Sequence, residues 1–223
     1  MLVPSEIYNQ TQLTELIQQI GFLPLLYSGI RGFSAEEVVS DDCRYVRFSD
    51  GGWDWPLWKW KGPIVTEGGC VYGKFFAGKA GFISREWWPD FCNYRRSQHH
   101  APEAGSIEEA ILLTLQEHGS FIARELRAAC GFTGPKMRSR FDSYVTRLQA
   151  ACRIVTEDFI YPRDKHGHEY GWGWSLLTTP EQLYGKDSCQ CPRTPDASFE
   201  RLLDHFKHIL PEASEREILR MLR

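Results

Sequence analysis

The stretch that decides the fold runs from Ser106 to Gly185 and begins SIEEAILLTLQEHG. Its first four residues have the spacing of a capping box, in which the hydroxyl of Ser106 accepts a hydrogen bond from the amide of Glu109 and the glutamate reaches back. Apolar residues then follow at helical spacing and stop at Gly119. This pattern predicts a helix with a defined start and end.

Two further helices and two strands are predicted in the same stretch. A short helix begins after Ser120, and a third opens at Gly134-Pro135, where proline suits the first helical position. Strand-like runs follow at 153–161 and 170–176, separated by a polar turn. Three helices followed by a β-hairpin is the order of a winged helix-turn-helix, which we therefore expect here.

The third helix has an apolar face and an opposite basic face, which is the pattern of a helix that enters the major groove of DNA. A basic hairpin tip would touch the adjacent backbone. The candidate DNA contacts on the helix and the tip are Lys136, Arg138, Arg140, Arg147, Arg163, Lys165 and His166. Two other interpretations stay open, because basic residues also serve as a solvated surface and winged helices also bind proteins.

The composition sets limits on partners and location. A net charge of −3 excludes a globally polybasic binder, so affinity for DNA has to come from a local patch and to weaken with salt. No apolar run approaches the roughly 18 residues of a membrane span, and the N-terminus has no signal-peptide pattern. The seven cysteines are scattered, unlike a disulfide framework. We expect a reduced, cytoplasmic protein that does not enter membranes.

Tryptophan is concentrated in the first half, where WDWPLWKW occupies residues 53–60. The alternation predicts extended segments that break at Pro56. One interpretation is a small core of large flat side chains. The other is a stacking platform for bases or another planar ligand, with nearby carboxylates as general acid or base. Phosphates would be steered by Lys59, Lys61, Lys74, Arg95 and Arg96. The residues of this candidate base pocket are Trp53, Trp55, Trp58, Trp87, Trp88, Glu67 and Glu86.

The whole chain is predicted to be α+β and to divide into three regions. Residues 1–105 form an aromatic-rich α+β region, 106–185 the winged-helix domain, and 186–223 a linker and a C-terminal helical hairpin. Within the first region we expect a helix over 6–20 and a β-hairpin of 71–76 and 81–84, and Ser198 is the expected cap of the first C-terminal helix. We expect the hairpin to dock on the main body, since long exposed apolar stripes are uncommon; pairing with a second copy or binding a partner protein are the alternatives. Phosphate-binding, dinucleotide and nucleophile motifs are missing from the sequence, and no paired zinc ligands are present, so no cofactor or metal is predicted.

Several segments resemble the AlkZ-related family, distant relatives of the AlkZ-type DNA glycosylases. The segments that carry the resemblance are 17–25 (IQQIGFLPL), 53–56 (WDWP), 72–76 (YGKFF), 81–87 (GFISREW), 124–126 (REL) and 172–177 (WGWSLL). The resemblance implies winged-helix units and an association with double-stranded DNA. In those glycosylases the matching helix leads into a glutamine segment that orients the attacking water, but Pro24 stands there in this chain. The family therefore implies DNA binding without the usual catalytic glutamine; a divergent glycosylase for alkylated or cross-linked bases is the alternative.

Overall fold

The computed structural model describes residues 6–47, 53–134, 137–169 and 171–223, and its architecture is α+β, as the sequence predicts. A six-stranded antiparallel sheet in the order β1-β5-β4-β7-β8-β6 runs through the molecule. The strands are β1 (Phe22–Pro24), β2 (Val46–Arg47), β3 (Trp53–Asp54), β4 (Cys70–Phe76), β5 (Lys79–Ser84), β6 (Phe121–Ile122), β7 (Val155–Ile160) and β8 (Trp174–Thr178). The helices are α1 (Gln10–Ile20), α2 (Ala35–Val38), α3 (Asp41–Arg44), α4 (Pro56–Thr66), α5 (Trp88–Gln98), α6 (Ile107–His118), α7 (Ala123–Ala129), α8 (Met137–Ala150), α9 (Pro180–Tyr184), α10 (Pro195–Ile209) and α11 (Glu215–Leu222).

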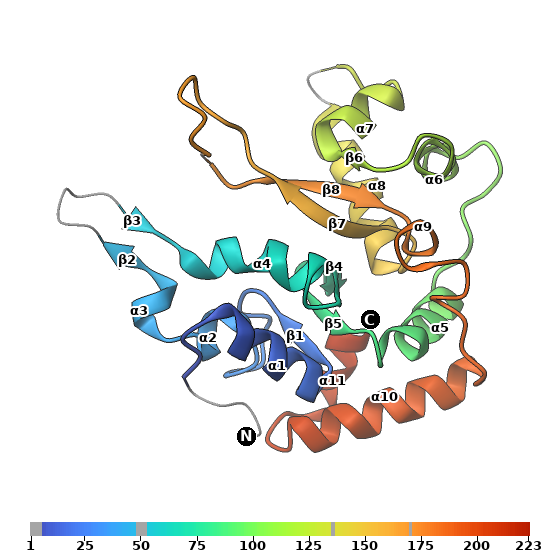
Figure 1. Cartoon of the computed structure of the whole chain (residues 1–223). Helices are drawn as coiled ribbons and strands as arrows, with labels where there is room; N and C mark the ends of the chain where they lie inside the picture. The colour runs from blue at the N-terminus through green and yellow to red at the C-terminus, as the bar shows by residue number, and fades with distance from the viewer. Residues whose placement is uncertain (1–5, 48–52, 135–136, 170) are drawn as a thin grey trace.

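The sheet joins two halves of the chain. Strands β1, β5 and β4 come from the first half, and β7, β8 and β6 come from the later stretch. They meet where Tyr72 of β4 pairs with Thr156 of β7. Figure 1 shows α1, α4, α5, α10 and α11 around the first three strands and α6, α7 and α8 beside the last three. The domain boundaries after residues 105 and 185 stay predictions.

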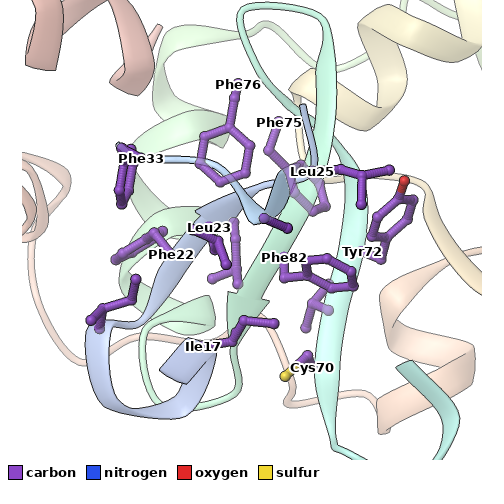
Figure 2. Packing of buried hydrophobic residues seen from close by; sticks show 14 of the residues in the cluster. Ile17, Phe22, Leu23, Leu25, Phe33, Cys70, Tyr72, Phe75, Phe76 and Phe82 are labelled. Carbon is purple, nitrogen blue, oxygen red and sulfur yellow. The ribbon is translucent and has the colours of Figure 1, made fainter. Parts of the chain in front are cut away.

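The larger of two buried apolar clusters lies around β1, β4 and β5. Figure 2 shows Phe22, Phe75 and Phe82 converging on this core from neighbouring strands. The predicted hairpin of β4 and β5 is confirmed, with a turn at Ala77-Gly78 where both residues have positive φ. Burying so many large side chains supplies the main stabilisation of this half, because apolar burial contributes about 25 cal/mol per Å².

The smaller cluster holds α6, α7 and α8 against β6 and β8, and includes Ile111, Phe141 and Leu177. The predicted cap of α6 is confirmed, since Ser106 accepts from the amide of Glu109 at 3.2 Å. The apolar face predicted for the third helix is also the buried face of α8.

The tryptophan-rich segment differs from the prediction. Pro56 does not break an extended segment; it is the first residue of helix α4, so Trp58 and Trp60 are helical. The missing N–H of proline costs nothing at that position. The alternation at 53/55 and 58/60 has the period of a strand, whereas Trp55 and Trp58 have a helical spacing of three, and the packing of α4 against β7 selects the helix.

Several predicted helix starts are wrong. Helix α1 begins at Gln10 after Asn9, whose side chain accepts from the amide of Gln12 at 2.9 Å, whereas the sequence analysis started it four residues earlier. The residues after Ser120 form strand β6 by pairing with β8, and the helix begins only at Ala123. In both cases hydrogen bonds that apolar spacing does not reveal decide where the helix begins. For α1 it is the bond to the Asn9 side chain, and for α7 it is the pairing of β6 with β8.

The C-terminal helices α10 and α11 pack on the main body as expected, with Leu202, Phe206 and Met221 fully buried in the larger cluster. Thr194, not the predicted Ser198, caps α10 by accepting from the amide of Ala197. Within the described residues, none of the helices has the length and apolar character needed to cross a membrane.

Candidate functional site

A cavity of about 740 Å³ opens between the start of α4 and the β7–β8 hairpin, and we call it the α4–hairpin cavity. Figure 1 shows α4 running beside this hairpin. The residues that line the cavity are Asp54, Trp55, Trp58, Lys59, Pro63, Tyr161, Glu169, Gly171 and Trp172. Its walls are thus mainly aromatic, with charged side chains among them.

Three indoles form a fixed arrangement in the wall. Trp55 and Trp58 are stacked, with ring centroids 5.1 Å apart, and Trp172 stands edge-on to both at 5.9 and 5.2 Å. Such offset and edge-on pairs contribute about 0.5–1.5 kcal/mol each beyond their buried area. Trp172 remains 54% exposed, so much of its ring is accessible to a ligand.

The backbone of the hairpin is pinned to α4 at Trp172. The indole N–H of Trp58 donates to the Trp172 carbonyl at 2.7 Å, and the ammonium of Lys61 donates to the same oxygen at 3.4 Å. Gly171 and Gly173 flank this residue with φ of +76° and +65°, a region that favours glycine. A Cβ on Gly173 would come within 2.9 Å of the Tyr161 ring. Trp172 is therefore positioned by its neighbours.

Lys61 is buried behind the aromatic wall, with 2% of its surface exposed. Its Nζ lies 3.4 Å from the centroid of the Trp58 ring and 4.0 Å from that of Phe159. Burial lowers the pKa of Lys61 to about 7. The two ring faces act in the opposite direction, because they attract the cationic form.

Charged groups at the cavity are paired within the chain. The Lys59 ammonium lies 2.7 Å from the Asp54 carboxylate, and Arg163 lies 3.1 Å from Glu169. Burial, together with nearby Glu169 and Asp158, raises the pKa of Tyr161 to about 12, so its hydroxyl stays protonated.

Two residues of the wall carry buried polar atoms without a partner among the described residues, namely Nε1 of Trp55 and Oη of Tyr161. Buried polar groups in folded proteins are normally hydrogen-bonded. Both atoms are shielded from solvent, so a ligand in the cavity would reach them only after the wall rearranged.

A second candidate surface is the exposed side of α8. Arg138 and Arg140 are both exposed there, and Arg138 lies 3.9 Å from Asp142. Arg140 donates to the Tyr144 hydroxyl at 3.4 Å. Arg147 instead forms an ion pair with Glu108 of α6, so it is directed towards a neighbouring helix. The predicted contact Lys136 lies outside the described residues.

The tip of the β7–β8 hairpin presents further predicted contacts. Lys165 and His166 are exposed. The Asp164 carboxylate accepts from the amides of His166 and His168, at 2.8 and 2.9 Å, and orders the turn. With Arg163 close by, the tip and α8 are two exposed places where cations are available for an anionic partner.

The other residues predicted for a base pocket lie elsewhere. Trp88 is fully buried, and Trp87 is stacked on His205 at 3.9 Å with Arg201 over its ring. Glu86 is near Arg201 at 3.8 Å. Glu67 is exposed at the end of α4, and the side chain of Trp53 lies outside the described residues. None of these four placed residues, Glu67, Glu86, Trp87 and Trp88, lines the α4–hairpin cavity.

Sequence reasoning missed Trp172 and Tyr161 as parts of a site, and it assigned Lys61 to phosphate steering, whereas Lys61 is buried behind the aromatic wall. The available signal was the pair of glycines around Trp172, which the sequence analysis placed in a strand. Pro24, at the position that matches the catalytic glutamine segment, is buried in β1 opposite Gly81 of β5. Among the described residues, no group of three or more His, Cys, Asp or Glu side chains is arranged to hold a metal ion.

Comparison with known proteins gives one match. A family model described as AlkZ related matches residues 7–223, nearly the whole chain. It confirms the resemblance found in the sequence segments. Neither the curated proteins nor the solved structures include a match.

Proposed function

Because the chain belongs to the AlkZ-related family, we propose that it is a DNA-binding protein in which residues 106–185 act as a winged helix-turn-helix. The order α6, α7, α8, then β7 and β8, supports this assignment. In such modules the last helix lies in the major groove and the hairpin touches the backbone beside it. The observation that carries the proposal is the exposed basic face of α8.

The contacts follow from which cations are accessible. Arg140 is exposed and donates a long hydrogen bond to the Tyr144 hydroxyl, so its guanidinium can still reach a base edge or phosphate. Arg138 extends the same face. At the tip, Lys165 and His166 would meet the adjacent backbone. Double-stranded DNA is thus the expected partner, held by a small number of phosphate contacts.

A divergent glycosylase is the second candidate function, favoured by the aromatic cavity. The usual glutamine is replaced by Pro24, which has no group that orients water, so the cavity's own carboxylates, Asp54 and Glu169, would have to act as base. Both are already ion-paired. An interaction module that binds protein remains the third hypothesis.

The test is equilibrium binding of a fluorescent duplex, measured by anisotropy over a range of salt concentrations. Arg140→Glu is expected to weaken binding by about tenfold or more and to reduce the salt slope by about one. Arg216→Glu makes the same charge change on an exposed residue of α11 and should leave binding unchanged. Equal affinities for the two variants would refute α8 as the DNA-reading helix.

The same duplex carrying alkylated bases separates the candidate functions. Salt-sensitive binding without abasic product supports the DNA-binding proposal. Release of alkylated base would support the glycosylase instead. A protein that binds neither duplex at any salt concentration would favour the interaction module.

A further inference from the structure

We propose that the α4–hairpin cavity binds an unpaired nucleobase and that the indole of Trp172 is its stacking surface. This inference rests on the proposed association with DNA. It adds a preference that groove reading by α8 does not supply: DNA with a base outside the stack should bind better than fully paired duplex.

The first argument is the chemistry of the walls. Proteins that hold unpaired bases stack them on aromatic rings, and each stacked base is tolerated whatever its identity because every base has a π-face. Trp172 offers such a face, since it is 54% exposed and contacts Trp55 and Trp58 through edge-on geometry. Tyr161 adds another flat aromatic ring to the wall.

The second argument is that the stacking surface is held in place before any ligand arrives. The carbonyl of Trp172 receives hydrogen bonds from Trp58 and Lys61, and the flanking glycines have positive φ. An exposed tryptophan on a mobile loop would lose conformational freedom on binding. One that is held this way loses less, which favours affinity.

The third argument is size and polarity. A volume of about 740 Å³ lies within the range of about 300–1,000 Å³ found for small-ligand sites. Lys59, 65% exposed at the cavity, can exchange its carboxylate partner for a phosphate.

The location of the cavity agrees with this occupant. It lies against the same hairpin whose tip carries Arg163, Lys165 and His166, so DNA held at the tip would bring its bases near Trp172. Trp174, two residues along the hairpin, is 40% exposed but outside the cavity, with Arg124 over its ring at 4.7 Å. It provides a matched control for an exposed tryptophan on the same element.

The experiment compares three labelled DNAs at one salt concentration: a paired duplex, the same duplex with one extra unpaired thymine, and a thymidine 20-mer. The full-length protein is expected to prefer the two DNAs with unpaired bases. Trp172→Ala should lose about 5- to 100-fold affinity for these two and keep its affinity for the paired duplex. Trp174→Ala should keep the preference, and Trp172→Phe should keep part of it.

Three outcomes would overturn the inference. The protein binds paired duplex in a salt-sensitive manner without any preference for unpaired bases, which leaves the proposed function intact. Trp172→Ala loses affinity equally for all three DNAs, which makes Trp172 a general contact. Trp172→Ala retains the preference, which moves the base site elsewhere. Failure to bind any DNA would instead refute the proposed function itself. Circular dichroism of each variant checks that the fold is retained.

Discussion

The C-terminal helices are tied to the main body by a buried carboxylate, and removing it should loosen the whole molecule. Asp90 of α5 has 3% of its side chain exposed. It accepts from the Ser198 hydroxyl at 2.9 Å, the Cys191 thiol at 3.3 Å and the Arg193 guanidinium at 3.1 Å, and it also pairs with Arg201. The perturbation we consider is Asp90→Ala.

The magnitude follows from what the substitution leaves behind. Breaking a buried ion pair costs about 3–5 kcal/mol when the remaining charge is trapped. Arg193 and Arg201 are 44% and 31% exposed, so both can turn to water, which lowers the cost. We therefore expect a loss of about 2–3 kcal/mol, the contribution of one or two hydrogen bonds to a charged group. For a chain of this length, that loss corresponds to a decrease in Tm of about 4–12 °C.

Thermal unfolding followed by circular dichroism at pH 7 provides the assay. Asp204→Ala removes a carboxylate from an exposed position of α10 and should change the free energy of unfolding by less than about 0.5 kcal/mol. If Asp90→Ala and Asp204→Ala unfold at the same temperature, the reasoning about this network is wrong. Asp90→Asn keeps a neutral acceptor for Ser198 and should fall between the two.

Acid provides an independent check on Asp90. Burial raises the pKa of its carboxyl, but hydrogen bonds from Ser198 and Cys191 and the charges of Arg201 and Arg193 outweigh that effect, so the net pKa is lowered. The stabilisation is therefore complete above the unfolded pKa of about 3.9 and is lost as the pH falls through the lower folded value. The difference in Tm between wild type and Asp90→Asn should narrow below about pH 4; a constant difference would contradict the assignment.

Two predictions concern the α4–hairpin cavity. Burial lowers the pKa of Lys61 to about 7, so the unfolded chain binds more protons between that value and about 10.4, and stability should rise with pH across this interval. Lys61→Met should flatten the rise in a series of Tm measurements from pH 7 to pH 10, and an unchanged slope would assign it to another group. Gly173→Ala meets both a positive φ and the Tyr161 ring, and should cost more than the roughly 1–2 kcal/mol of backbone strain alone. Gly167→Ala, with a positive φ and open space, measures the strain alone by chemical denaturation; equal losses would show that the ring yields without cost.

Local signals in the sequence predicted local structure well. The Ser106 cap, the β4–β5 hairpin and the buried face of α8 depend on residues only a few positions apart. The start of α4 did not follow from spacing, because the pairs 53/55 and 58/60 have the period of a strand and the helix depends on packing against β7.

The cavity could not be assembled from the sequence because its parts are far apart in the chain. Trp58 and Trp172 are 114 positions apart, yet they share a hydrogen bond of 2.7 Å. The sequence analysis instead placed Trp58 in one predicted pocket with Trp87 and Trp88. In the fold, Trp88 lies in the larger core and Trp87 is stacked on His205. The local sequence does carry one sign of the site, because the glycines at 171 and 173 permit the backbone conformation that positions Trp172.

A chain with a net charge of −3 needs a reason to bind DNA, and the two candidate surfaces together supply one. The cations at Arg138 and Arg163 are already paired with carboxylates. Exposed pairs of this kind contribute only about 0–1 kcal/mol, so exchanging the carboxylate partner of an arginine for a DNA phosphate costs little. Because these arginines are already neutralised, the exchange also leads to a small net release of counterions on binding. We therefore expect binding through α8 and the hairpin tip to be salt-sensitive, with a smaller slope than a polybasic surface would give. Stacking on Trp172 does not depend on counterions, so it would add affinity that persists as salt increases. This division would let a weakly acidic protein bind DNA without a polybasic surface.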